Sequence, residues 1–478
     1  MRAPQTNAPS ACKGGALCAP PMLPRKESCV PSKHSFVFAS AFALFVFGSP
    51  AGIVSVAHAQ VDPGPRGGAP GAGGPISPLT AGETAFFNAG LAAFNEIDDV
   101  PDGLGPRFNL DSCAGCHAHP AVGGSSPAAN PQVGVAPPGQ LAAVQSFILP
   151  SGPVREVRFK SDGGVHDLFT IVGLPGAGAC NIAQPDFAGH LASGDVVFRI
   201  PTPVFGAGFI EAISESTILA NVNSNKPFGI KGHENRNGND GTITRFGWKA
   251  QNKSVLIFSG EAYNVEQGIA NEAFPDERGE SGVPDPDVCK APPAPSDHTN
   301  FEQTTPASSI PSDVIGFANF MRFLAPPAPA CAVGSTCSAS INRGSDLFNT
   351  VGCNVCHVRS MVTGNHSTGS LNGKTANLFS DLLVHDMGAI GDGISQGTAG
   401  PREFRTAPLW GLGQRIFFLH DGRTRDLLEA IAAHAAPAQP PVIVPPVAAK
   451  AEARDVVANF NKLTVAQKQD LLNFLRSL

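Results

Sequence analysis

The motif Cys-x-x-Cys-His occurs twice in this chain, at Cys113–His117 and, 240 residues further on, at Cys353–His357. Cysteines three residues apart lie on one side of a helical turn, so both thiols can bond to the vinyl groups of a haem. The adjacent histidine then supplies the proximal ligand of the iron. The pattern predicts two covalently bound haem c groups, attached at Cys113, Cys116, Cys353 and Cys356 and ligated by His117 and His357.

The first 59 residues have the pattern of a secretory signal peptide. Five basic residues and one acid, Glu27, precede an uncharged stretch rich in Phe, Ala and Val. That stretch ends at Ala57-His58-Ala59, which fits the A-x-A cleavage pattern. We expect cleavage after Ala59, a periplasmic location and no stable membrane span in the mature protein. The alternative is an uncleaved membrane anchor.

Removal of the leader changes the charge and cysteine counts. The chain has 33 basic and 39 acidic residues, and the leader carries 5 and 1, which leaves 28 and 38, or a net charge of −10. No basic stripe remains, so we expect no nucleic-acid partner. Four cysteines remain outside the motifs, and an oxidising compartment favours two disulfides. Cys331–Cys337 would close a short loop and Cys180–Cys289 follows by elimination, while four free thiols are the alternative.

Glycine and proline make up 97 of the 478 residues (53 plus 44), so we expect a loop-rich chain. Residues 60–79 are Pro/Gly-rich and are predicted to be a flexible linker. The sequence Pro-Pro-Ala-Pro at 326–329 marks a boundary between two halves. The expected organisation is a signal peptide (1–59), this linker, an N-terminal haem c domain with an insertion (80–328) and a C-terminal cytochrome c-like domain (329–478).

Each half is expected to pair an early helix with a late one, as cytochrome c does. The helices are predicted at Thr80–Asn95 and Ser312–Leu324 in the first half, and at Arg343–Thr350 and Thr464–Leu478 in the second, with Ser312 and Thr464 as N-caps. Short β-like runs at Val154–Phe159 and Val196–Ile200 fall in a long insertion, 140–235. The predicted fold class is therefore mainly α, with two cytochrome c-like haem domains, the first carrying a loop- and hairpin-rich insertion.

A further iron ligand is predicted at His434. Thr424 or Asp426 caps a helix in which Leu427, Ile431 and His434 share one apolar face. A buried imidazole needs a partner, and haem iron is one. The alternative is a core histidine bonded to a carbonyl.

Several segments carry a resemblance to a known family. They are Gly103–Asn109, Pro203–Glu211, Arg245–Ala250, Asp381–Gly388, Phe404–Gly413, Phe418–Arg423 and Leu428–Ile431. Together they resemble the bacterial di-haem oxidoreductases, a family of peroxidase-like proteins of which some are called thiol oxidoreductases. More distantly, they are similar to the di-haem cytochrome c peroxidases and to the enzyme that matures methylamine dehydrogenase. The resemblance covers residues 80–478 and is strongest over 400–435.

The resemblance implies roles for residues around the second haem. In the peroxidases a methionine ligand lies fourteen residues after the histidine of a His-x-Gly turn, and here that spacing leads from His420 to His434. A histidine at this position implies a bis-histidine haem of lower potential. Met387 and His385 remain rival ligands. Arg405 and Arg423 are implied partners of haem propionates, with surface ion pairing as the alternative.

The resemblance also implies a catalytic pair near the first haem. Trp248 stands where the relatives have an aromatic residue between the haems. Glu266 follows eighteen residues later and is the implied proton carrier for peroxide cleavage, with Glu261 as the nearby alternative. Ordinary core packing and a solvated carboxylate are the competing interpretations. An assisting glutamine of the peroxidases has no match, because Ser259 or Gly260 stands at its place, and no calcium ligands are evident.

These features together predict a periplasmic di-haem oxidoreductase of the cytochrome c peroxidase type. Electrons would pass between the haems and reduce a small oxidant such as peroxide at the N-terminal haem, with a redox protein as the other partner. The alternatives are an electron-carrier cytochrome without catalytic activity and a regulatory haem module. A carrier would need a distal ligand on the first haem. His119 is too close to His117 to serve, whereas His166, His190 and His233 are open candidates.

Overall fold

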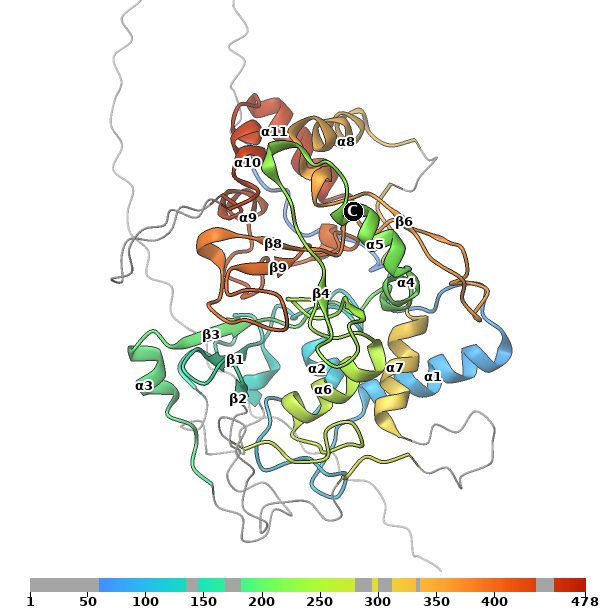
Figure 1. Cartoon of the computed structure of the whole chain (residues 1–478), viewed down its shortest axis with the longest axis vertical. Helices are drawn as coiled ribbons and strands as arrows, with labels where there is room; N and C mark the ends of the chain where they lie inside the picture. Colours follow the sequence, from blue (N-terminus) through green and yellow to red (C-terminus); the bar gives the residue numbers. More distant parts are fainter. Residues whose placement is uncertain are drawn as a thin grey trace, which may run out of the picture. The chain divides into compact units, whose positions relative to one another are not determined.

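The computed structural model describes residues 60–134, 145–167, 182–279, 295–299, 312–331, 336–435 and 451–478. Residues 57–478 form one compact unit (Figure 1). The expected leader, together with Cys180 and Cys289, lies outside the described residues. The described part is mixed, 34% helical and 11% strand, so the expectation of a mainly α chain was right about the helices and wrong about the strands.

The helices of the described residues include the predicted ones and several that the sequence analysis did not predict, and one predicted helix begins at Ala339 rather than at Arg343. They are α1 (Ala81–Asn95), α2 (Cys113–Cys116), α3 (Phe187–Ala192), α4 (Ala207–Ala212), α5 (Glu215–Val222), α6 (Val255–Gln267), α7 (Asp313–Phe323), α8 (Ala339–Val351), α9 (Leu427–Ala433), α10 (Arg454–Asn461) and α11 (Val465–Leu475). The hydroxyl of Ser312 accepts from the amide of Ile315, and Thr464 forms a capping box with Gln467. These local hydrogen bonds explain why the helix starts were predictable.

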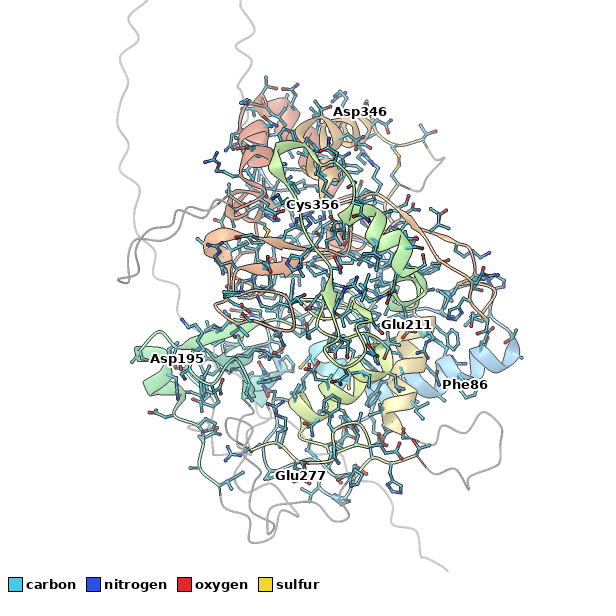
Figure 2. The ribbon with its side chains drawn as sticks, in the orientation of Figure 1. Phe86, Asp195, Glu211, Glu277, Asp346 and Cys356 are labelled. Atoms are coloured by element: carbon cyan, nitrogen blue, oxygen red, sulfur yellow. A yellow bond between two sulfur atoms is a disulfide. The ribbon has the colours of Figure 1, made fainter. Side chains whose placement is uncertain are left out.

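The first helical group consists of α1, α6 and α7 (Figure 1). A Cβ on Gly90 would lie 2.3 Å from the carbonyl oxygen of Gly316, so only glycine lets α1 and α7 cross this closely. Phe94 packs at 4.8 Å from Phe320 between ring centroids. Arg322 of α7 donates to Glu211 of α4 at 2.7 Å, which ties these helices together (Figure 2).

The second helical group consists of α8, α10 and α11. Gly344 lies so close to the backbone of Asp470 that a Cβ at this position would come within 2.0 Å of the carbonyl oxygen of Asp470. The rings of Phe348 and Phe474 meet edge to face, with centroids 5.4 Å apart. The two groups belong to two separate hydrophobic clusters, the first of which includes Cys113 and the second Cys353 and Cys356.

The strands are short and antiparallel. They are β1 (Glu156–Phe159), β2 (His166–Asp167), β3 (Val196–Arg199), β4 (Asn235–Arg236), β5 (Ile243–Thr244), β6 (Met361–Val362), β7 (Thr375–Ala376), β8 (Val384–Asp386) and β9 (Glu403–Arg405). The largest described sheet has the order β2-β1-β3, and the others are two-stranded. The glycine- and proline-rich loops cannot form helix, so they satisfy buried backbone groups by these short pairings. This is why the chain is mixed.

The segment predicted as a linker makes specific contacts. The amide of Ile76 donates to the carbonyl of Phe323 at 2.8 Å. Asp62 forms a buried ion pair with Arg476 at 2.6 Å. Residues 60–79 therefore lie along both α7 and the C-terminal helix rather than spanning open space. The predicted disulfide between Cys331 and Cys337 is present.

Candidate functional site

The first Cys-x-x-Cys-His motif forms one helical turn, α2, with both cysteines unbridged. The Nδ1 of His117 lies 2.9 Å from the carbonyl oxygen of Gly124, to which it donates. No described residue hydrogen-bonds its Nε2. A fixed Nδ1–H sets the tautomer and leaves Nε2 as a lone-pair donor, which is the arrangement of a metal-ligating histidine. Burial also lowers the pKa of His117 to about 4, which keeps the ring neutral.

A cavity opens beside this turn. Cys113 and His117 lie in its wall, together with Trp248, Glu261 and Glu266. The ring of Phe94 stands edge-on to His117, with centroids 6.0 Å apart. The structure therefore brings the first motif, the predicted aromatic residue and both predicted carboxylates to one cavity.

The second motif repeats this geometry. Cys353 begins a short 3-10 turn, and the Nδ1 of His357 donates to the carbonyl oxygen of Phe379 at 3.0 Å. Its Nε2 has no hydrogen-bond partner in the described part of the chain. A second cavity is lined by Cys353, His357 and Cys356, which is labelled in Figure 2. Burial lowers the pKa of His357 to about 4.

The side chain of His434 lies in the wall of the same cavity. Asp426 caps α9, as one of the two predicted candidates, and His434 ends the helix. Its Nδ1 donates to the carbonyl oxygen of Ala430 at 2.7 Å, while Nε2 meets no partner among the described residues. His434 is also close enough to His357 for a charge on it to lower the pKa of that ring. Two neutral imidazoles with available Nε2 atoms thus line one cavity.

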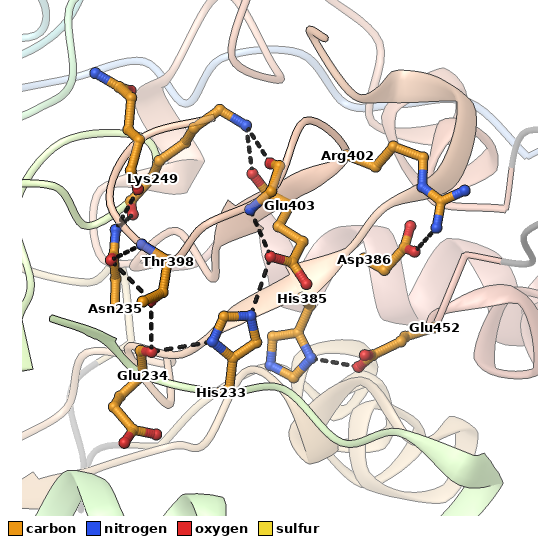
Figure 3. Close-up of polar contacts among 12 residues, drawn as sticks. His233, Glu234, Asn235, Lys249, His385, Asp386, Thr398, Arg402, Glu403 and Glu452 are labelled. Carbon is orange, nitrogen blue, oxygen red and sulfur yellow. Dashed lines mark hydrogen bonds and ion pairs between the residues drawn. The ribbon is translucent and has the colours of Figure 1, made fainter. Parts of the chain in front are cut away.

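The rival ligands also lie in this wall, but His385 is already occupied. Its Nδ1 contacts Glu452 at 2.7 Å, as drawn in Figure 3, and its Nε2 contacts Asp381 at 3.0 Å. Burial opposes a charge on the ring, but Cys356 and Asp381 raise the pKa of His385 well above its ordinary value. A protonated imidazole that donates hydrogen bonds from both nitrogens has no lone pair to offer iron. Of the predicted ligands of the second haem, this leaves His434 and Met387.

Trp248 lines both cavities. Its Nε1–H donates to the carbonyl oxygen of Ile200 at 2.9 Å, which fixes the ring plane. The indole therefore lies in the wall of the cavity beside each of the two motifs.

Glu266 has the electrostatic character of a proton carrier. Burial, followed by the negative charges of Glu156 and Glu261, raises the pKa of Glu266 to about 8, while Arg158 opposes the shift. Such a carboxyl gains and loses a proton near neutral pH. Glu261 accepts a hydrogen bond from Asn252. Ser259, one of the two residues at the position where the peroxidases have a glutamine, lies in the wall of the first cavity.

Several wall residues were missed by the sequence analysis. Gln251 lines the first cavity three residues after Trp248. Glu156, Arg158 and Arg199 come from the paired strands β1 and β3. The alternation of polar and apolar residues along β1 was a signal of a two-sided strand, but it does not reveal which cavity the polar face meets.

Of the two predicted partners of haem propionates, Arg405 lines the second cavity, whereas Arg423 is paired with a neighbouring carboxylate. Arg405 and Arg415 both line the second cavity, and burial lowers the pKa of each to about 10. Arg405 donates to the carbonyl of Arg245, but its Nε has no partner, and neither arginine forms an ion pair within the described part of the chain. Arg423 instead pairs with Asp421 at 2.7 Å. Two cations without described counter-charges fit the anionic propionates of a haem.

The remaining candidate histidines lie elsewhere. His119 contacts the carbonyl of Gln414 at 2.7 Å. His190 stacks on Phe159 and bonds Asp195, and His233 pairs with Glu403 (Figure 3). His166 lies near the first motif, where its Nε2 is 3.4 Å from the amide of Asn109.

The two cavities, each with its own Cys-x-x-Cys-His motif, define a protein that holds two haems in one compact unit. Residues 181–478 match the family described as "Di-haem oxidoreductase, putative peroxidase". Because this match covers more than half of the chain, the protein belongs to that family. Family membership implies two haems. Within the described residues, no helix has the length and apolar character needed to cross a bilayer.

Three solved structures are similar to the chain. One is a MauG-like protein associated with microbial copper homeostasis, at 14% identity over 85% of this chain and 93% of that chain, with a TM-score of 0.38. Another is the diheme peroxidase BthA of Burkholderia thailandensis, at 14% identity over 56% and 77%, with a TM-score of 0.29. Hydrazine synthase of Kuenenia stuttgartiensis matches at 17% identity over 35% of this chain, with a TM-score of 0.23, and the chain spans 55% of that protein's length. No curated protein matches the sequence.

Proposed function

We propose that this protein is an exported di-haem c-type oxidoreductase that reduces a small peroxide at the first haem, using electrons delivered through the second. The observation that carries the proposal is the asymmetry of the two cavities. In the second, two of the lining imidazoles, His357 and His434, have Nδ1 fixed by a backbone carbonyl and Nε2 without a described partner. The wall of the first contains one imidazole, His117, together with Glu261 and Glu266. An iron with a single protein ligand can bind an oxidant.

Covalent attachment is supported by the cysteines. All four motif thiols are unbridged, and each motif presents its pair on one turn. Desolvation raises the pKa of Cys113 and Cys116 well above the ordinary range, so these thiols are protonated and unlike reactive thiolates. Export through the 1–59 leader is supported by the Cys331–Cys337 disulfide, because disulfides persist in oxidising compartments. We also propose that a boundary between residues 328 and 329 separates the N-terminal haem c domain (80–328) from the C-terminal cytochrome c-like domain (329–478).

The chemistry is divided between the cofactor and the chain. The haems supply electron transfer and the binding of the oxidant. Glu266 would accept a proton from one oxygen of a peroxide and return it to the departing oxygen, which needs a pKa near the working pH. Arg405 and Arg415 would hold the propionates of a haem in the second cavity, and Trp248 lies in the wall of both cavities.

Electron paramagnetic resonance of the oxidised holoprotein tests the proposal. A high-spin signal beside a low-spin signal is expected, because only the second iron would have two imidazole ligands. Two low-spin signals, with no response to peroxide, would instead indicate the electron-carrier function. Mass analysis should show two haem adducts, and a chain with fewer would contradict the covalent assignment.

A further inference from the structure

A cationic side chain is built into the wall of the first cavity. Glu156 and Arg158 stand two residues apart on β1, so both side chains point to the same face of the strand. Both line the cavity together with Glu266. The side chain of Arg158 is only 8% exposed.

The guanidinium of Arg158 is fixed but not saturated. Its Nε and Nη2 atoms each lie 2.5 Å from Oε1 of Glu156, and Nη1 donates to the carbonyl of Gly164 at 2.7 Å. These contacts use three of the five N–H donors of a guanidinium, and none of the other described residues accepts the remaining two. An arginine whose position is fixed by hydrogen bonds, and which still has two N–H donors without acceptors, is suited to bind an anion.

Arg158 is also the cation that acts on Glu266. Its positive charge opposes the rise in the pKa of that carboxyl, whereas the other arginine of the wall, Arg199, has no such effect on Glu266. Arg199 is instead paired with Asp392 at 2.6 Å. The proton carrier and the unsaturated guanidinium therefore lie together.

We propose that Arg158 is a further catalytic residue, which donates hydrogen bonds to the anionic oxygen released when the O–O bond of a peroxide breaks. This inference rests on the proposed function. Hydrogen peroxide takes up two electrons and two protons and yields two molecules of water. A one-electron donor protein supplies the electrons through the haem pair, and Glu266 returns a proton to the leaving oxygen. Arg158 stabilises the negative charge on that oxygen until the proton arrives, as preorganised donors do in other active sites.

The test uses two ligands on the holoprotein. Fluoride is an anion that accepts hydrogen bonds when it binds ferric haem, and carbon monoxide is a neutral ligand of ferrous haem. Arg158→Leu should weaken fluoride binding about tenfold or more, because it removes hydrogen bonds to an anionic ligand. Carbon monoxide affinity should be unchanged, and Arg158→Lys should retain part of the fluoride affinity.

Arg236 provides the matched control. Arg236 ends strand β4, and its guanidinium donates to the carboxylate of Glu234, two residues earlier in the chain, at 2.8 Å. Arg236 lines neither haem cavity. Arg236→Leu should bind both ligands as the unaltered protein does. In Arg158→Leu, unchanged fluoride affinity overturns the inference but leaves the proposed function standing, and an equal loss of both ligands assigns Arg158 a structural role. Failure of both ligands to bind the unaltered protein overturns the proposed function itself.

Discussion

The indole of Trp248 stands edge-on to the imidazole of His420, with ring centroids 6.4 Å apart. His420 stacks in turn on Phe404 at 4.3 Å, and both of these rings line the second cavity. The backbone reinforces the link, because the amide of Ile200 donates to the carbonyl of His420 at 2.8 Å. Trp248, held by Ile200, thus begins a continuous aromatic contact from one cavity to the other.

Trp248→Leu should slow electron exchange between the two haems, because it removes the aromatic contact from the wall that the cavities share. The measurement is the rate at which the reduced second haem is re-oxidised after rapid mixing with peroxide. Trp248→Phe should retain part of the rate. Trp410, the other tryptophan of the chain, lines neither haem cavity, so Trp410→Phe should leave the rate unchanged.

His434→Met should raise the reduction potential of the second haem, since a methionine axial ligand favours the reduced iron more than an imidazole does. A spectroscopic redox titration measures the change. Met387→Leu is the control, and it should leave the potential in place. An unchanged titration in His434→Met, together with a shift in Met387→Leu, would transfer the ligand role to Met387.

The helices and their caps could be predicted because their signals are local. Ser312 and Thr464 each bond an amide three residues away, and the same short range connects Asp426 to the start of α9. The position of His434 at the end of that helix followed from spacing alone. The Cys331–Cys337 disulfide was predictable for the same reason, since its loop is short.

The cavity walls could not be predicted, because distant segments build them. The sequence left His385 as a rival ligand, because it does not show that Asp381 and Glu452 contact the two ring nitrogens. Glu452 is 67 residues away in sequence. Arg158 enters the first cavity only because β1 pairs with strands on both sides. No local pattern distinguishes Arg415, which lines the cavity, from Arg423, which pairs with its neighbour Asp421.

Arg405→Gln and Arg415→Gln should each lower the potential of the second haem. A nearby cation favours the uptake of an electron, and neither arginine has a counter-charge among the described residues to screen it. Redox titration measures the shift. Arg423→Gln is the matched control, because its partner Asp421 already neutralises it, and an equal shift in all three variants would contradict the propionate assignment.

Asp381→Asn should destabilise the protein by about 3–5 kcal/mol, the usual cost of breaking a buried ion pair. Asp381 is fully buried between Lys226, at 2.6 Å, and His385, at 3.0 Å, so its loss leaves Lys226 without its anion and His385 with Glu452 alone. Denaturant unfolding of the holoprotein measures the difference. Asp455→Asn, at an exposed ion pair with Arg454, should change the midpoint little.

Glu266 should make the folded protein less stable as the pH rises. Its pKa is raised from 4.5 to about 8, first by burial and then by the charges of Glu156 and Glu261. Between these two values the folded state keeps a proton that the unfolded chain has released. Stability conferred by that proton is present at low pH and is lost as the pH rises toward about 8.

Glu266→Gln removes this dependence, because an amide does not ionise. Unfolding free energies measured across the same pH range should therefore fall less steeply in the variant, and the two proteins should converge below the ordinary carboxyl pKa of 4.5, where Glu266 is protonated in both folded and unfolded chains. If the two pH profiles run parallel, Glu266 is ionised in the folded protein at neutral pH. In that case its pKa is not raised toward the working pH, the carboxylate is a weak proton acceptor there, and the role of Glu266 as a proton carrier in peroxide cleavage is contradicted.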